Sequence, residues 1–271
     1  MTQQVVLAVK DLSKSYSSQG KERTVLERVS FEARAGEFVC IVGPSGSGKT
    51  TLLRCMAGLL EPSAGAVLID DEIVREPPQK LAVVFQDYSR SLMPWMSVIN
   101  NVMLPLRSKN LNGAARRARA IEALRGVGLD GFNNHYPWQL SGGMQQRVAI
   151  ARALAYQPEA LLMDEPFASV DAQTRSELED LILRVRDDFG VTVILVTHDI
   201  DEAVYLADQV VVLTGSPTRV RERIAVPLPL PRDQIATKSL PQFADLRARV
   251  LMLIHETGAR NKPPLSHIRC A

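Results

Sequence analysis

The sequence lacks a long apolar run. Its uninterrupted apolar stretches have the length of strands, and none approaches the roughly 20 residues that span a bilayer. The first residues, MTQQVVLAVKDLSKSYSS, also lack the positive segment, long apolar run and small-residue cleavage site of a secretion signal. We therefore expect any role of this protein at a membrane to depend on a partner.

Cysteine and net charge are scarce as well. The three cysteines, Cys40, Cys55 and Cys270, are odd in number and show no CxxC or metal-ligand spacing, which argues against a disulfide framework and favours a reducing compartment. A formal net charge of +2 gives no bulk electrostatic attraction to nucleic acid, so no nucleic-acid partner is expected. With 271 residues, of which 46% are hydrophobic, the chain can bury a large core without covalent cross-links.

Strand-like and helix-like patterns alternate along the chain. Segments with helical spacing separate the later β-rich apolar runs, and this alternation predicts a parallel sheet covered by helices on both faces. The expected strands are residues 5–9, 24–33, 37–42, 66–70, 81–86, 160–164, 192–198 and 209–213. Helices are expected after Lys49, within 97–129, and at 141–156, 171–189, 199–208 and 240–255, and PLPLPRD at 227–233 predicts a stiff extended connector.

The glycine-rich stretch GPSGSGKT lies between a predicted strand and a predicted helix, which is the context that a phosphate-binding loop requires. Glycines let backbone N–H groups point inward around a phosphate, and the helix N-terminus adds positive potential there. We expect Lys49 to neutralise the β- and γ-phosphates and the Thr50 hydroxyl to bind Mg²⁺. The predicted nucleotide-binding residues of this loop are Gly43, Pro44, Ser45, Gly46, Ser47, Gly48, Lys49, Thr50 and Thr51.

Two acids follow an apolar strand in LLMDEP, residues 161–166, as in a Walker B element. Asp164, at the end of the strand, is placed to hold Mg²⁺, normally through a water. Glu165 is placed to orient or deprotonate the attacking water. Taken alone, two adjacent acids beyond a strand are often only a solvated loop, but their pairing with a phosphate loop favours the catalytic interpretation.

With these motifs in order, the chain resembles the nucleotide-binding subunit of an ATP-binding cassette (ABC) transporter. Tyr16 matches the aromatic residue that stacks on adenine, and Gln86 matches the Q-loop glutamine that reaches the metal and the attacking water. LSGG at 140–143 matches the family signature, SVD at 169–171 the D-loop, and His198 the switch histidine. The resemblance implies an α/β fold with a P-loop NTPase core of the ABC type, an N-terminal antiparallel β subdomain and an inserted helical subdomain.

This family pattern also implies a division of the chain. The ATP-binding core would comprise residues 1–87 and 157–226. The helical subdomain that carries the signature would comprise residues 88–156. Residues 227–271 would form a connector and a final helix. Met144 stands where many members have Gln, and Val170 where Leu is usual. Neither change removes a phosphate ligand or a proton carrier, so ATPase activity is still expected.

The signature points to a second nucleotide. A Ser and two Gly at a helix N-terminus present free N–H groups and a hydroxyl, which suit a γ-phosphate. The loop at 43–50 is already sufficient to bind the triphosphate of one ATP. We therefore expect Ser141, Gly142 and Gly143 to bind the ATP of another copy. Asp171 is also expected to lie near a nucleotide. A head-to-tail homodimer with two ATP molecules at its interface follows.

The resemblance further suggests a task. A stand-alone cassette without membrane spans is expected to dock, at the cytoplasmic face of the membrane, on a separate multi-span permease served by a solute-binding protein. The apolar patch at residues 92–96, which contains Trp95, is either core of the helical subdomain or a docking groove for that permease. The LMPWMSVINNV pattern and the tail from Pro227 most resemble the nitrate, sulfonate and taurine importer group. A soluble ABC ATPase with a non-transport partner and a cassette that binds ATP without turnover remain as alternatives.

Overall fold

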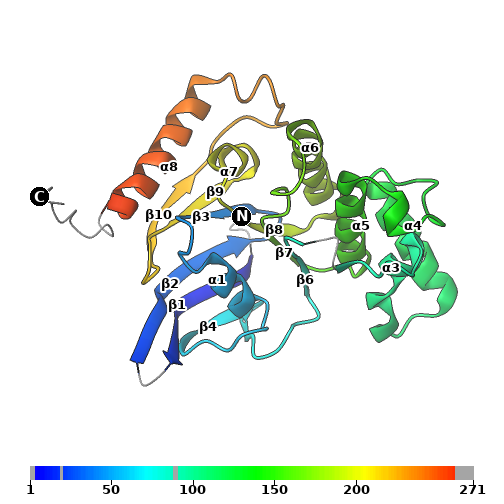
Figure 1. Ribbon diagram of the computed structural model, residues 1–271, viewed down its shortest axis with the longest axis horizontal. Coiled ribbons are helices and arrows are strands. Elements are labelled where there is room, and N and C mark those ends of the chain that lie inside the picture. The colour runs from blue at the N-terminus through cyan, green and yellow to red at the C-terminus, as the bar shows by residue number, and fades with distance from the viewer. Residues whose placement is uncertain (1–3, 19–20, 88–90, 260–271) are drawn as a thin grey trace, which may run out of the picture.

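Two β-sheets and a set of helices build the molecule (Figure 1). It is a computed structural model that describes residues 4–18, 21–87 and 91–259 of the chain. The predictions for Cys270 and for the first and last residues of the chain lie outside this part.

The first sheet is antiparallel and has four strands in the order β2-β1-β4-β5. Its strands are β1 Val5–Ser18, β2 Lys21–Arg34, β4 Ala64–Ile69 and β5 Glu72–Ile73. Side chains in the second half of β2 alternate between buried and exposed, as expected for a sheet with one face on the core. The N-terminal antiparallel β unit implied by the sequence is therefore present.

The second sheet has six strands in the order β10-β9-β3-β8-β7-β6. They are β3 Phe38–Val42, β6 Leu81–Val84, β7 Ala160–Asp164, β8 Thr192–Thr197, β9 Gln209–Leu213 and β10 Val220–Ala225. All pairs are parallel except β9 with the edge strand β10, which the sequence pattern did not predict. Because β3, β7 and β8 are parallel neighbours, the loops that follow them meet at one edge of the sheet.

The parallel sheet is covered on both faces, as predicted. On one face, alternate residues of β3, β7 and β8 pack with α1 (Lys49–Met56) and the antiparallel sheet. On the other face the remaining residues pack with the helical layer. That layer contains α5 (Gly142–Ala155), α6 (Ala172–Phe189), α7 (Ile200–Leu206) and α8 (Pro241–Ala259).

The helical block predicted for residues 97–129 is broken into shorter pieces. It contains α3 (Val98–Met103), the 3-10 helix η1 (Pro105–Ser108) and α4 (Gly113–Gly126). Pro105 begins the 3-10 turn, and Asn112 starts α4 by accepting a 2.8 Å hydrogen bond from the Ala115 N–H. A second 3-10 helix, η2 (Pro137–Gln139), leads into α5.

The connector at 227–233 was predicted to be extended, and only its first part has an extended backbone. From Asp233 the backbone turns, because Thr237 N–H donates to the Asp233 carbonyl over 3.0 Å and Asp233 N–H donates to the Thr237 hydroxyl over 2.9 Å. The chain then enters α8, which packs on α7 and β9. Among the helices of the described residues, none is both long and apolar enough to pass through a bilayer.

Candidate functional site

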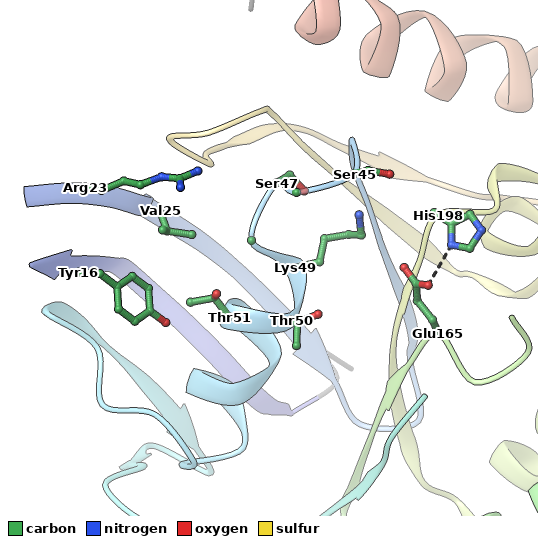
Figure 2. Close-up of a pocket in the computed structure, with 12 residues that line it drawn as sticks. Tyr16, Arg23, Val25, Ser45, Ser47, Lys49, Thr50, Thr51, Glu165 and His198 are labelled. Carbon is green, nitrogen blue, oxygen red and sulfur yellow. Dashed lines mark ion pairs between the residues drawn. The ribbon is translucent and has the colours of Figure 1, made fainter. Parts of the chain in front are cut away.

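A cavity of about 860 Å³ opens where the phosphate loop, the β1–β2 hairpin and the ends of β7 and β8 meet (Figure 2). It brings together residues from four separate parts of the sequence. The cavity is lined by Tyr16, Arg23, Val25, Ser45, Gly46, Ser47, Gly48, Lys49, Thr50, Thr51, Glu165 and His198. Most of the residues predicted for nucleotide binding and turnover therefore share one site.

The phosphate loop depends on glycine at two positions in particular. Gly46 and Gly48 have φ angles of 74° and 85°, in the left-handed region that other residues rarely adopt. A Cβ on Gly48 would also lie 2.7 Å from Cγ1 of Val25 on β2. The Ser47 hydroxyl is buried and finds no hydrogen-bond partner among the described residues. Residues 45–51, in the loop and at the start of α1, line the cavity, which is where an anion site is expected.

Lys49 supplies the positive charge of this site. Its side chain is largely buried, and Nζ donates to the carbonyl oxygens of Gly43 over 2.9 Å and of Pro44 over 3.1 Å. Burial lowers the pKa of Lys49, and the nearby carboxylates of Glu165 and Asp164 oppose that shift. Gly43 and Pro44, predicted as nucleotide-binding residues, lie behind the loop and hold the lysine instead of lining the cavity.

Asp164 and Thr50 bring a carboxylate and a hydroxyl group together. Asp164 ends β7, and its carboxylate accepts a hydrogen bond from the Thr50 side chain. Burial, and next the negative charge of Glu165, raise the pKa of Asp164. Two carboxylates this close repel each other unless a cation lies near them, and carboxylate and hydroxyl oxygens are ligands that Mg²⁺ prefers. The residues present therefore fit a magnesium ion.

Glu165 connects three of the predicted catalytic groups. Its Oε2 lies 3.1 Å from Nδ1 of His198 and 3.4 Å from Nε2 of Gln86, which donates to it. About 59% of the His198 side chain is exposed, compared with 21% for Glu165. The imidazole is thus at the mouth of the site, and the carboxylate is deeper.

Tyr16 forms the opposite wall, and the structure adds two residues that the sequence interpretation missed. Its ring is 43% exposed on β1, with Nζ of Lys14 lying 5.4 Å from the ring centroid. Arg23 pairs directly with Tyr16 in the β1–β2 ladder, and Val25 also lines the cavity. A hairpin assignment would have placed Arg23 beside Tyr16, but the second strand was expected to begin only at residue 24, whereas β2 begins at Lys21.

The signature residues lie away from this cavity. None of Ser141, Gly142 and Gly143 lines it; they begin α5, at the opposite side of the molecule in Figure 1 from the β1–β2 hairpin. Ser141 is the N-cap of α5, and its hydroxyl accepts a 3.3 Å hydrogen bond from Met144 N–H. A Cβ on Gly143 would approach Cγ2 of Thr174 to 2.4 Å, so glycine is needed there for α5 to pack on α6.

Asp171 is also outside the cavity, where it is the N-cap of α6. Its two carboxylate oxygens accept hydrogen bonds from the backbone N–H of Thr174 over 3.0 Å and from its hydroxyl over 2.6 Å. These bonds lower the pKa of Asp171, with the hydroxyl bond contributing most. The carboxylate thus has a structural task in this chain, and its predicted contact with nucleotide stays a prediction.

The apolar patch at residues 92–96 is partly buried and partly exposed. Leu92 is buried in the core of the helical region, and Asn101 fixes the turn by hydrogen bonds with the backbone of Met93 and Met96. The Trp95 side chain, in contrast, is 70% exposed. The patch is therefore partly core, and its exposed part consists of Pro94 and Trp95 on a turn that Asn101 fixes.

Comparison with known proteins agrees with this geometry. Residues 26–168 match the family described as ABC transporter. The chain is 45% identical over 208 residues to the taurine import ATP-binding protein TauB of Yersinia pestis bv. Antiqua, covering 77% of this chain and 80% of that protein. It is 39% identical over 254 residues to the aliphatic sulfonates import ATP-binding protein SsuB of Bacillus cereus, covering 94% and 98%.

A solved structure shows the same fold. The dimeric, post-hydrolysis state of the ATP-binding cassette MJ0796 bound to ADP and Pi matches with a TM-score of 0.70 and 35% identity, over 81% of this chain and 98% of that one. The fold and the motifs together define an ATP-binding cassette of the P-loop type. The chain belongs to the ABC transporter family, which confirms the resemblance drawn from its motifs.

Proposed function

We propose that this chain is the ATP-hydrolysing subunit of an importer for a small solute, working with a separate membrane permease. The observation that carries the proposal is the meeting of Lys49, Glu165 and His198 on one cavity beside the Thr50–Asp164 pair. A phosphate-binding loop alone would support nucleotide binding. The added carboxylate and imidazole are the groups that turnover requires.

In the proposed reaction, a water oxygen forms a bond to the γ-phosphorus while the bond from that phosphorus to the β,γ-bridging oxygen breaks. Glu165 accepts a proton from the water, and ADP and phosphate leave. Lys49 lies where it can neutralise charge on the phosphates. His198, within 3.1 Å of Glu165, orients the carboxylate.

Thr50 and Asp164 would hold Mg²⁺, and Gln86 would approach it from the side of Glu165. When bound, the ion would neutralise charge on the β- and γ-phosphates. Tyr16 would stack on the adenine at the opposite end of the cavity.

The separation of the signature from the cavity supports a site shared between two copies. Ser141, Gly142 and Gly143 begin a helix, yet they are remote from the phosphate loop of their own chain. In a head-to-tail dimer they would contact the γ-phosphate bound to the other copy, so that ATP joins the halves and hydrolysis releases them. The dimeric form of the related cassette bound to ADP and Pi supports this arrangement.

Coupling to transport would follow from the same closure. The exposed Trp95 lies in the helical region close to Gln86 in sequence, where it is placed to receive a segment of the permease. Closing the dimer would draw two such contacts together and change the access of the membrane channel. The names of the relatives support a sulfonate, taurine, nitrate or bicarbonate as the solute.

The test is affinity purification of the tagged Glu165→Gln chain from detergent-solubilised native membranes with Mg-ATP, followed by mass spectrometry. We expect a multi-span permease to co-purify, and its solute-binding protein can then be screened for ligands. Recovery of soluble proteins alone would leave the ATPase proposal intact but would replace the importer assignment with the non-transport alternative.

A further inference from the structure

Helix α7 begins at the loop that carries His198, which the proposed reaction uses, and helix α6 begins at the D-loop motif. The N-cap of α6 is Asp171, the last residue of the D-loop motif, and the N-cap of α7 is Asp199, which directly follows His198. The positions of these two helices therefore determine where the D-loop and the imidazole of His198 lie.

Direct contacts join α6 to both ends of α7. Near their N-termini, Nη1 of Arg175 on α6 lies 3.0 Å from Oδ2 of Asp199. One oxygen of that carboxylate thus binds Arg175, while the other accepts the N–H groups of Asp201 and Glu202. Further along, the hydroxyl of Tyr205 on α7 donates to Oδ1 of Asp180 on α6 over 2.6 Å.

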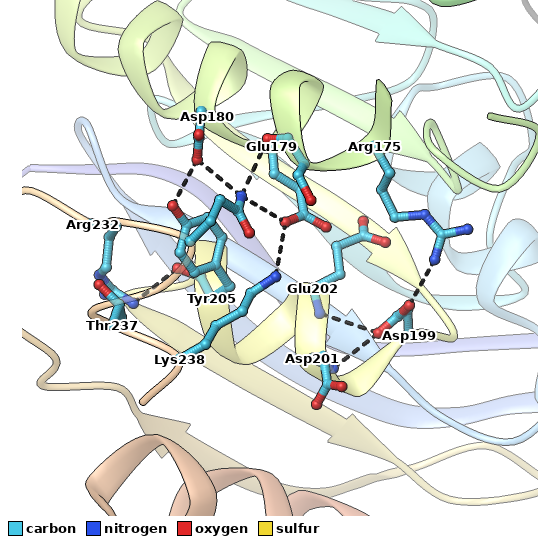
Figure 3. A network of polar contacts seen from close by, with 12 residues as sticks. Arg175, Glu179, Asp180, Asp199, Asp201, Glu202, Tyr205, Arg232, Thr237 and Lys238 are labelled. Atoms are coloured by element: carbon cyan, nitrogen blue, oxygen red, sulfur yellow. Dashed lines mark hydrogen bonds and ion pairs between the residues drawn. The ribbon is translucent and has the colours of Figure 1, made fainter. Parts of the chain in front are cut away.

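Arg232, from the connector that follows β10, holds the other end of α7 (Figure 3). Its guanidinium donates to the carbonyl oxygens of Val204 and Tyr205 over 3.3 and 2.9 Å, and to that of Ala207 over 3.0 Å. These are carbonyls that a helix leaves unsatisfied at its C-terminus, where a positive charge is also favourable. Burial lowers the pKa of Arg232, so this cation is partly desolvated to reach them.

Two further connector residues bind α6. Nε2 of Gln234 lies 3.0 Å from Oε2 of Glu179 and 2.9 Å from Oδ1 of Asp180, the carboxylate that also binds Tyr205. Nζ of Lys238 lies 3.4 Å from Oε2 of Glu179 and 4.8 Å from the ring centroid of Tyr205. The connector segment 232–238 therefore contacts α6 and α7 at once, and the turn closed by Asp233 and Thr237 keeps it compact.

The last link runs from α7 to the histidine. The buried carboxylate of Glu202 accepts a 3.1 Å hydrogen bond from the hydroxyl of Thr197, and that hydroxyl accepts the N–H of Asp199 over 3.0 Å. His198 lies between these two residues. A shift of α7 would therefore change the turn that carries the imidazole.

We propose that Arg232, Gln234 and Lys238 are positioning residues for ATP hydrolysis: they hold α6 and α7 in register and so fix His198 against Glu165. This inference rests on the proposed ATPase function of the site. It assigns the connector after the cassette a role in turnover, although none of its residues lines the nucleotide cavity.

The test compares Arg232→Met with Arg221→Met in the full chain. Both changes keep an unbranched side chain and remove a guanidinium, but Arg221 lies 3.3 Å from Glu256 and joins β10 to α8 only. For Arg232→Met we expect kcat to fall at least fivefold, with KM for ATP and Kd for ADP within twofold of the wild-type values. Arg221→Met should leave all three within twofold.

A direct readout of the imidazole separates positioning from loosened structure. The chain has four histidines, and the NMR signal of His198 can be assigned with His198→Ala. We expect this signal to shift in Arg232→Met and to stay in place in Arg221→Met. Lys238→Met gives the same test if Arg232→Met does not fold.

Two results would overturn the inference. One is a kcat per ADP-binding chain within twofold of wild type in both Arg232→Met and Lys238→Met. The other is an equal loss of kcat in Arg221→Met. A wild-type chain that binds ADP but hydrolyses no ATP would instead contradict the proposed function itself.

Discussion

Glu165 is one of the few non-glycine residues among those described that have a positive φ. Its φ is 43°, in a region that costs a non-glycine residue about 1–3 kcal/mol. The conformation is held by its own N–H, which donates to the Val196 carbonyl over 2.8 Å, and by the pairing of β7 with β8. Strain of this kind is typical of residues whose side chains must be aimed, here toward His198.

The first prediction concerns this carboxylate. Glu165→Gln keeps the shape of the side chain but cannot accept the proton of the attacking water. We expect phosphate release to fall by about 100-fold to 10,000-fold, the usual contribution of a general base, while one ATP still binds per chain. Steady-state phosphate release and equilibrium nucleotide binding measure the two effects. Turnover within tenfold of wild type would contradict the role given to Glu165.

For single residues, the sequence was sufficient to predict a place in the site where a motif identifies the chemistry. Lys49, Glu165 and His198 were predicted and lie together, because the loops after parallel neighbouring strands must meet. Arg23 and Val25 were missed, because no motif marks them and the second strand was expected to begin only at residue 24, whereas β2 begins at Lys21 and pairs Arg23 with Tyr16. The N-cap bonds of Asp171 depend on local geometry that a motif does not describe.

Among the elements, the contact between α5 and α6 explains one glycine of the signature without reference to any ligand. A Cβ on Gly143 would lie 2.4 Å from Cγ2 of Thr174, much closer than van der Waals contact. We expect Gly143→Ala to lower the free energy of unfolding by about 1–3 kcal/mol, as overpacked sites do. Urea unfolding without nucleotide measures it.

The matched variant is Gly143→Ala with Thr174→Ser. Serine removes the clashing methyl group and keeps the hydroxyl that donates to Asp171. The double variant should regain stability to within about 1 kcal/mol of the wild type, and the double-mutant cycle should give a coupling energy well outside additivity. Additive effects would contradict the direct contact.

The buried start of α7 predicts a pH dependence of stability. Burial, followed by the charges of Glu179 and Asp199, raises the pKa of Glu202 from 4.5 to about 8, against smaller lowering effects of Thr197 and Arg175. Between these two pH values the folded chain holds a proton here that the unfolded chain has lost. This contribution to stability is therefore complete below pH 4.5 and is lost as the pH rises to 8, by at most about 1.4 kcal/mol per pH unit.

Glu202→Gln, which mimics the neutral carboxyl, removes that contribution. The free energy of unfolding of the wild type minus that of the variant should fall steadily from pH 5 to pH 8. Urea titrations at four pH values give the difference. A constant difference across this range would show that Glu202 titrates alike in the folded and unfolded chains.

The boundaries of helices and strands could be predicted where the apolar periodicity was strong. They could not be predicted where local turns determine where an element ends. The strand and helix alternation from residue 141 to residue 213 appears as predicted, because buried strands and amphipathic helices have distinct periods, but strand β10 was not predicted. The break between α3 and α4 depends on Pro105 and the Asn112 cap, and the turn at 233–237 depends on side-chain bonds to the backbone. Such bonds do not alter the apolar pattern.

For the whole molecule, the arrangement of the helical region predicts where a partner binds. Trp95 is exposed on a turn that Asn101 fixes, and tryptophan is enriched among interface hot spots. Trp95→Ala should leave basal ATPase activity within twofold of wild type and reduce co-purification of the permease at least tenfold. Trp138→Ala, at an equally exposed tryptophan outside the 92–96 patch, is the control. Unchanged recovery of the permease with Trp95→Ala would contradict docking at this residue.

We propose that two copies share the ATP, because the phosphate loop and the signature lie apart in one chain. Light scattering of Glu165→Gln with and without Mg-ATP tests this arrangement, with Ser141→Arg in the same background as the control. We expect the mass to rise from the 29.9 kDa of one chain to about twice that value with Mg-ATP, and not to rise in the control. A mass that stays at one chain while each chain binds an ATP would contradict it.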